Sequence, residues 1–307
     1  MSETVQFRMG GYGPSTSSHS RALEIFSAYL QDDKGESIDP KYFWNVMDFD
    51  YRADDLLWMV EQGILTLCYF SSSYLSDRVP ELNIIDLPFV FDSTAEAHAA
   101  LDGELGRRLS EKVEATTGYR VLGFWENGFR HLSNRLSPVH RPADLQDMRI
   151  RMQPNQTHIE TFELLGAIPV SLDLKPGIEH IVTGKVDAQE NPLVNTLTYG
   201  VADHQKFITM SAHFYGARIL LVHKDSFDSW PESLQQSVRE AGRKAIEFQR
   251  ATVAAEEQDV RDKLVDLGCS FVEPSEEERQ EFKERVAPVI DKARTELGEE
   301  WFDLISN

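Results

Sequence analysis

The chain has 307 residues, of which 41% are hydrophobic and 27% charged, so it can bury a sizeable core and its composition argues against disorder. Its 31 basic and 51 acidic residues give a net charge of −20, which argues against nucleic acid or an anionic membrane surface as the main partner, because both need a basic face. No apolar run approaches a membrane helix and no export signal is visible, so we expect a cytoplasmic protein or a mature form without its signal. The length predicts about two domains.

The first half of the chain predicts strands that alternate with helices. Alternating apolar residues predict a strand over residues 5–9, and the serine and threonine hydroxyls at 15–18 can cap a helix over residues 19–30. Further elements are expected in this order: a helix at 54–62, a buried strand at 64–70, a packed loop at 84–91 that Pro88 interrupts, a helix at 94–115 and a strand at 119–125. This alternation is typical of a mostly parallel sheet.

The second half repeats the pattern and ends in longer helices. Strands are expected at 148–152, 168–170, 186–188, 207–210 and 218–222, with helices at 157–165 and from about Pro176 to Gly184. From Pro231 a helical spacing of apolar residues continues to Gly268. Such a helix would be about 50 Å long, longer than one domain, so we expect it to run along two lobes. The acidic stretch 273–284 predicts solvated helix faces.

Familiar catalytic signatures are absent from the sequence. It has no G-x-S-x-G, H-E-x-x-H or phosphate-binding G-x-x-x-x-G-K-[ST] motif, so we assign no catalytic residue and expect no cofactor and no metal. The Gly11-Tyr12-Gly13 turn follows a strand, but Thr16 replaces the third glycine of a dinucleotide loop. Cys68 and Cys269 lie in apolar surroundings and are expected to be buried free thiols.

Arginines at strand positions are the remaining chemical signal. Arg149 and Arg151 are two residues apart in an otherwise apolar strand, so they are predicted to share a face. Arg130 follows the strand that ends near Trp125. An inward-facing arginine is costly unless a carboxylate or phosphate pairs with it. Spacing alone favours a structural ion pair for each arginine, and an anionic ligand is the alternative.

Two central blocks resemble a known transport family. Residues 144–152 (DLQDMRIRM) resemble the DLxGxKIRV block of the solute-binding subunits of TRAP transporters (tripartite ATP-independent periplasmic, DctP type), and residues 184–192 (GKVDAQENP) resemble their GxVDGQENP block. WENGFR at 125–130, DLPFVF at 86–91 and HFY at 213–215 also match. Asp147 and Ala188 stand where glycine is usual, and residues 36–50, with Tyr42, Phe43 and Trp44, depart from the pattern. The resemblance covers about residues 5–305.

The resemblance implies an α/β, two-lobed periplasmic-binding-protein-like fold with mixed sheets and a long helix spanning both lobes. Lobe I would comprise residues 1–124 and about 210–250, and lobe II residues 125–209 and about 251–307, with a solute cleft between them. It also implies a periplasmic location, with the export signal removed or omitted, and we expect a monomer.

By matching motif, Arg151 resembles the arginine that grips the solute carboxylate, Arg130 the auxiliary cation and Asn191 the amide that completes the clamp. A guanidinium offers two parallel N–H donors that match both carboxylate oxygens. Side chains of segments that line the cleft in the family are further candidates, of which two or three aromatics are expected to touch the solute: Tyr12, His19, Tyr69, Phe70, Trp125, Phe129, Phe214, Tyr215, Ser17 and Ser72. The aromatics favour an aromatic or bulky monocarboxylate over a small dicarboxylate.

The implied function is a non-catalytic binding protein that captures a small organic acid and delivers it to TRAP membrane permease subunits, without nucleic acid and without inserting into the membrane. Two alternatives stay open from the sequence. One is an enzyme acting on an organic acid, with Glu126 and Asp187 as the conveniently placed acids, and the other is a carboxylate-sensing module that works with a receptor.

Overall fold

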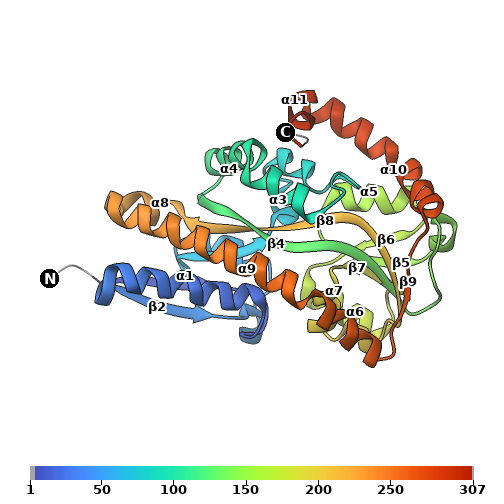
Figure 1. Cartoon of the computed structure of the whole chain (residues 1–307), viewed down its shortest axis with the longest axis horizontal. Coiled ribbons are helices and arrows are strands. Elements are labelled where there is room, and N and C mark those ends of the chain that lie inside the picture. The colour runs from blue at the N-terminus through green and yellow to red at the C-terminus, as the bar shows by residue number, and fades with distance from the viewer. Residues whose placement is uncertain (1–3, 306–307) are drawn as a thin grey trace. The chain divides into compact units, whose positions relative to one another are not determined.

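The computed structural model describes residues 4–305 (Figure 1). Its internal contacts divide the chain into two compact units. Unit 1 comprises the residues up to Ser72, Leu101–Glu126 and Ala217–Ala255, and unit 2 comprises Ser73–Ala100, Asn127–Gly216 and the residues from Glu256. The lobes expected from the sequence differ from these units chiefly in residues 73–100, and the solute cleft between lobes stays a prediction.

Unit 1 is a helix-covered sheet. Its elements are β1 (Val5–Gly10), α1 (Ser18–Lys34), β2 (Ile38–Phe43), α2 (Asp55–Glu61), β3 (Leu67–Ser71), α4 (Glu104–Thr116) and α8 (Lys224–Ser229). Strand β1 pairs in parallel with β2 and β3, and β3 pairs antiparallel with the end of β8 (Phe207–His223). All five residues of β3 are buried, which agrees with the apolar run that predicted this strand.

Unit 2 has the same kinds of element. They are α3 (Thr94–Asp102, whose last two residues belong to unit 1), β5 (Arg149–Met152), α5 (Gln156–Leu164), β6 (Ile168–Ser171), α6 (Leu174–Thr183), β7 (Ala188–Asn191), α7 (Leu193–Thr198), β9 (Ser270–Val272), α10 (Glu276–Leu297) and α11 (Glu299–Phe302). Strand β5 lies between β6 and β7 and is parallel to both. Its apolar residues Ile150 and Met152 are fully buried in a core with Phe162 of α5.

Three long elements contribute residues to both units. They are β4 (Tyr119–Asn134), β8 and α9 (Glu232–Asp266). The 35 residues of α9 confirm the long helix predicted from Pro231 onward. Strand β4 pairs antiparallel with β7, and β8 pairs in parallel with β9, so the sheet is mixed rather than mostly parallel.

Polar and glycine residues set several helix ends where the sequence placed them. The Ser17 hydroxyl accepts a hydrogen bond from the Ser20 N–H and begins α1. Gly184 ends α6 in a left-handed conformation, with φ of 72°. Asp147, at the position where the resemblance expects glycine, also has a positive φ of 61°, which explains why glycine suits that turn.

Two predicted elements are corrected. The helix expected over residues 94–115 is divided into α3 and α4, because Gly103 is extended between them. A Cβ at Gly106 would lie 1.8 Å from the Leu101 carbonyl oxygen, so glycine permits the close turn between the two helices. The strands expected at 207–210 and 218–222 are one strand, β8, because the HFY segment between them is also extended.

Candidate functional site

Arg151 of unit 2 is buried without an acidic partner. Its side chain is 2% exposed, and its Nε donates a hydrogen bond of 3.0 Å to the Leu172 carbonyl oxygen. Within residues 4–305 no carboxylate pairs with Arg151. Arg149, two residues earlier in the same strand, has an acidic partner, because it is exposed and its Nη2 lies 2.7 Å from Oδ1 of Asp187. A buried charge is costly unless it is paired, so the Arg151 guanidinium is suited to an anion that comes from outside the chain.

Arg130 of β4 has a carboxylate partner within unit 2. Its Nη2 donates to Oε1 and to the backbone oxygen of Glu190, each at 2.8 Å, and its Nε also contacts Oε2. Burial alone would raise the pKa of the Glu190 carboxyl, but the charge of Arg130 and a contact with His213 outweigh burial and hold that pKa well below its usual range. Glu190 is therefore ionised and neutralises Arg130, the arrangement that spacing alone favoured.

Asn191, the third residue of the expected clamp, belongs to a run of buried amides. Its Oδ1 accepts a hydrogen bond of 2.9 Å from Asn195, whose Nδ2 also lies 3.1 Å from Oδ1 of Asn127. The first turn of α7 carries Asn195 and so fixes the orientation of Asn191. The sequence interpretation missed Asn127 and Asn195, although both lie inside or beside the quoted motifs.

The strand registers bring the three clamp candidates onto neighbouring strands of unit 2. Arg151 of β5 is paired with Gln189 of β7, and Asn191 of β7 is paired with His131 of β4, next to Arg130. Gln153, two residues after Arg151, is buried, and its Nε2 has no hydrogen-bond partner among the described residues. Among the described residues, unit 2 thus gathers a guanidinium without a carboxylate partner, an amide donor without a hydrogen-bond partner and a run of amides on and around β5, β7 and β4.

Unit 1 contains a cluster of aromatic side chains. The ring of Tyr69 lies 5.4 Å from Tyr12, 5.2 Å from His19 and 5.3 Å from Trp125, measured between centroids. Tyr12 also contacts Phe70, at 4.8 Å. The indole N–H of Trp125 is buried and has no hydrogen-bond partner in residues 4–305, so this N–H is available to donate to a ligand oxygen.

His19 is held neutral inside this cluster. Burial lowers its pKa well below the usual range and the charge of Arg218 lowers it further, although the hydrogen bond to the Glu126 carbonyl oxygen acts in the opposite direction. Its Nε2 lies 2.9 Å from that oxygen, and therefore carries the proton. The same carbonyl accepts a hydrogen bond of 2.7 Å from Gln249 of α9. His19 therefore acts as a neutral, hydrogen-bonded ring.

Arg218 is a further buried cation that the sequence interpretation did not select. Its guanidinium carbon lies 4.7 Å from the ring centroid of Tyr12 and 5.5 Å from that of Tyr69, distances at which a cation is attracted to an aromatic face. The signal that could have found it is the same as for Arg151, an arginine in an otherwise apolar strand. The aromatic cluster of unit 1 thus packs against the guanidinium of Arg218.

The remaining aromatic candidates lie in unit 2. Phe214 stacks on His158, with 4.1 Å between centroids, and belongs to the hydrophobic core of the unit. Tyr215 makes edge contacts with Phe91 and Phe129, at 5.7 and 5.4 Å. These packing contacts are those of core residues. Of the serine candidates, Ser17 caps α1, and Ser72 donates to the Ala217 carbonyl oxygen at 3.3 Å.

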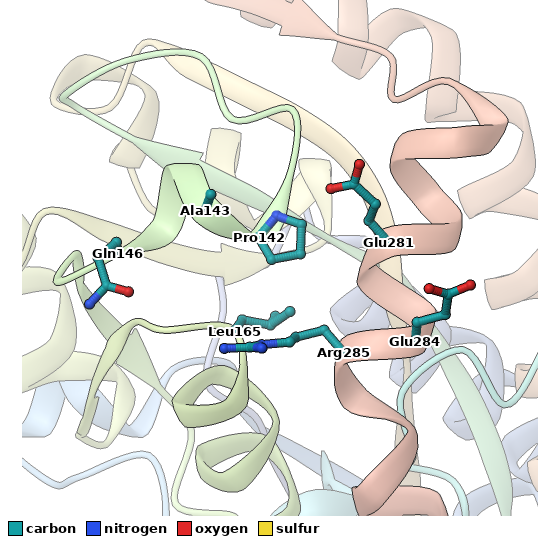
Figure 2. A pocket seen from close by; sticks show the side chains of 7 residues that line it. All are labelled: Pro142, Ala143, Gln146, Leu165, Glu281, Glu284 and Arg285. Carbon is teal, nitrogen blue, oxygen red and sulfur yellow. The ribbon is translucent and has the colours of Figure 1, made fainter.

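Unit 2 also contains an open hollow that none of these candidates lines (Figure 2). It has a volume of about 530 Å³ and is lined by Pro142, Ala143, Gln146, Leu165, Glu281, Glu284 and Arg285. Arg285 donates 2.7 Å to the Leu164 carbonyl oxygen. Residues 4–305 contain no cluster of three His, Cys, Asp or Glu side chains placed to hold a metal ion, and no helix in that range is long and apolar enough to span a membrane.

Comparisons with known sequences point to one family. The model of the bacterial extracellular solute-binding proteins, family 7 (DctP), matches residues 11–296. The chain is 32% identical over 270 residues to an uncharacterized protein of Haemophilus influenzae, covering 88% of this chain and 81% of that protein. It is 30% identical over 221 residues to the 2,3-diketo-L-gulonate-binding periplasmic protein YiaO of Escherichia coli, covering 72% of this chain and 67% of that protein.

Solved structures give the same result for the fold. A TRAP periplasmic solute-binding protein from Polaromonas, bound to D-erythronate, is 26% identical with a TM-score of 0.93, covering 99% of this chain and 98% of that one. The sugar acid binding protein of Advenella mimigardefordensis, in complex with galactonate, is also 26% identical with a TM-score of 0.93, covering 99% and 97%. The similarity confirms the α/β fold class with mixed sheet and long helix that the family resemblance implied.

Proposed function

Because the chain belongs to family 7 of the bacterial extracellular solute-binding proteins, the DctP-type periplasmic subunits of TRAP transporters, we propose that it captures a small organic acid by its carboxylate and delivers it to membrane permease subunits. This family consists of solute-binding proteins, not enzymes. Because its model matches residues 11–296, the family membership that the central blocks suggested is confirmed.

The observation that carries this proposal is that Arg151 is buried without a carboxylate partner among the described residues. Its guanidinium carries a permanent charge. Burying a cation in this way costs several kcal/mol unless an anion compensates it. A solute carboxylate supplies that anion, and its two oxygens match two parallel N–H donors. Gln189 is the register partner of Arg151, and Asn191 with its hydrogen-bonded neighbour Asn195 follows two residues further along the chain.

For the rest of the solute we propose a hydroxylated monocarboxylic acid. Three of the relatives at 26–30% identity bind D-erythronate, galactonate and 2,3-diketo-L-gulonate, each with one carboxylate on a chain rich in oxygen, whereas another, of 29% identity, is named as binding C4-dicarboxylates. The side-chain N–H of Gln153, two residues after Arg151 in unit 2, is buried without a hydrogen-bond partner among the described residues and suits a hydroxyl or carbonyl oxygen of such a chain.

A matched ligand screen tests both steps. Sugar acids such as galactonate and erythronate are compared with the alditols of the same carbon number, which keep the hydroxyls and lack the carboxylate, and with succinate. A solute present at a hundred times its dissociation constant stabilises the folded protein by about 2.7 kcal/mol, which a thermal-shift assay detects. Calorimetry then measures the affinity of each compound that raises the melting temperature.

We expect at least one sugar acid to bind and its alditol to have no effect. Equal binding of acid and alditol would refute capture through the carboxylate. Binding of succinate with no binding of any sugar acid would refute the monocarboxylate class and keep the carboxylate anchor.

Delivery requires a separate measurement, because a sensing protein would bind solute equally well. Permease subunits are reconstituted in vesicles, and uptake of the identified acid is measured with and without this protein outside. Uptake that depends on the protein supports delivery. Uptake that is unchanged by the protein, with solute binding intact, would contradict it.

A further inference from the structure

A glycine inside helix α6 leaves the space in which the side chain of Arg151 lies. A Cβ added at Gly177 would be 2.6 Å from Nε of Arg151, 3.1 Å from its Cγ and 3.2 Å from its Cδ. The first distance is shorter than any contact that a real Cβ makes, so a side chain at position 177 would force the arginine to move. Nothing in the helix requires this glycine, because its N–H makes an ordinary bond of 2.9 Å to Asp173.

The same helix start holds one edge of the guanidinium. Leu172 lies directly before the N-cap of α6, and its carbonyl oxygen accepts the Nε–H of Arg151 at 3.0 Å. Nε is therefore already used by the protein. A carboxylate can meet a guanidinium either through Nε and one Nη or through both Nη atoms. Because Nε donates to Leu172, only the arrangement through both Nη atoms allows the guanidinium to donate two hydrogen bonds to the solute carboxylate.

We propose that Gly177 and the Leu172 carbonyl form a cradle that presents Arg151 to the solute end-on, through its two Nη atoms, and that Gly177 is the positioning residue of this site. The proposal rests on carboxylate capture by Arg151 and adds how that residue is oriented. The proposal also explains why position 177 is glycine, although glycine in a helix interior makes the helix less stable than alanine would by about 0.5–1 kcal/mol.

The test is Gly177→Ala, with Val182→Ala as the matched control. Val182 is an exposed residue of the same helix, so both variants place alanine on α6. We expect Gly177→Ala to keep or raise the melting temperature and to weaken binding of the sugar acid found in the screen by about tenfold or more, the order expected when one charge-assisted hydrogen bond is lost. Val182→Ala should bind within about twofold of the unmodified protein. An affinity in Gly177→Ala within twofold of the unmodified protein would overturn the proposal.

A second readout needs no solute and therefore separates this proposal from the proposed function. The Nε–H resonance of Arg151, assigned by its loss in Arg151→Lys, is followed by NMR. We expect slow exchange with water in the unmodified protein and in Val182→Ala, and exchange at least tenfold faster in Gly177→Ala. Equal exchange in all three would refute the cradle, whether or not a carboxylate binds. If the cradle is intact and no acid binds, the proposed function fails and the positioning of Arg151 by Gly177 stands.

Discussion

At the scale of single residues, environment separates arginines that the sequence presents alike. Arg130 is neutralised by Glu190, Arg149 is paired with Asp187 at the surface, and Arg151 is buried with only a backbone oxygen on its Nε. Strand spacing could predict that these arginines needed anions. It could not predict which anion each receives, because Glu190 and Asp187 come close only through the pairing of strands distant in sequence.

Replacing Arg151 by lysine removes the forked donor and keeps the charge. We expect Arg151→Lys to weaken binding of the carboxylate solute by about thirty-fold to several thousand-fold, corresponding to roughly 2–5 kcal/mol for a disrupted buried ion pair. Calorimetry measures the affinity, and circular dichroism shows that the fold is retained. Arg149→Lys, which changes an exposed pair with Asp187, is the control and should bind normally. Normal binding by Arg151→Lys would make Arg151 a structural residue.

The pairing of Arg130 with Glu190 predicts a different kind of effect. Glu190→Gln removes the counter-charge of a guanidinium that is 1% exposed, so the free energy of unfolding should fall by about 3–5 kcal/mol. Urea denaturation measures this loss. The double variant Arg130→Leu, Glu190→Leu removes both charges and should be less destabilised than the single variant. A loss below about 1 kcal/mol in Glu190→Gln would show that Arg130 is not held mainly by Glu190.

At the scale of elements, α9 supports β4 through one buried amide. Oε1 of Gln249 accepts the Glu126 N–H at 2.9 Å, and its Nε2 donates to the Glu126 carbonyl oxygen at 2.7 Å. The side chain thus satisfies both backbone groups of one residue, as a neighbouring strand would. It does so at the last residue of β4 that belongs to unit 1.

Removing this amide should therefore destabilise the protein. Gln249→Ala removes the acceptor of the Glu126 N–H and leaves the Glu126 carbonyl oxygen with its hydrogen bond from His19. We therefore expect the free energy of unfolding to fall by about 1–3 kcal/mol, the cost of one unsatisfied buried group. Gln258→Ala, an exposed glutamine of the same helix that pairs with Asp262, should change it by less than about 0.5 kcal/mol. Thermal and urea unfolding compare the two. Equal effects would show that the contact with Glu126 contributes little.

Most elements could be predicted from periodicity and end signals, and the errors have physical causes. Helix caps and apolar stripes are local features of the sequence, so they could be recognised without the structure. They correctly predicted α1 from Ser17, α6 from Gly184 and α9 from the helical spacing of apolar residues after Pro231. The break at Gly103 was missed because glycine is tolerated inside helices. The continuous β8 was missed because the apolar alternation is interrupted between its two halves. The grouping of site residues by strand register depends on tertiary pairing and has no local signal.

At the scale of the whole molecule, buried histidines make stability depend on pH. Burial, with nearby positive charges, lowers the pKa of His131 to about 3, and its Nδ1 accepts the Ala212 N–H at 3.2 Å. The unfolded chain takes up this proton from about pH 6.5 downward, whereas the folded protein does not until about pH 3. Stability is therefore lost as the pH falls through this window. His19 and His213, whose pKa values burial also lowers, act in the same direction.

Each such histidine contributes up to about 1.4 kcal/mol per pH unit to this loss. We expect His131→Gln, which keeps an acceptor for the Ala212 N–H and does not titrate, to reduce the slope of the unfolding free energy between about pH 6 and pH 4 by about 1 kcal/mol per unit. Urea denaturation at a series of pH values measures the slope. An unchanged slope would contradict a lowered pKa for His131.

The path of the chain through its two units has a consequence for how the protein is made. Unit 1 needs residues up to Ala255 and unit 2 needs residues near the carboxyl end, so neither is a segment that a ribosome finishes early. An emerging chain has strands β1 to β3 long before the end of β8, with which β3 pairs. Contacts of such sequence separation form slowly. The nascent protein therefore stays incompletely folded until most of it has been synthesised, and neither unit can be excised as a contiguous fragment.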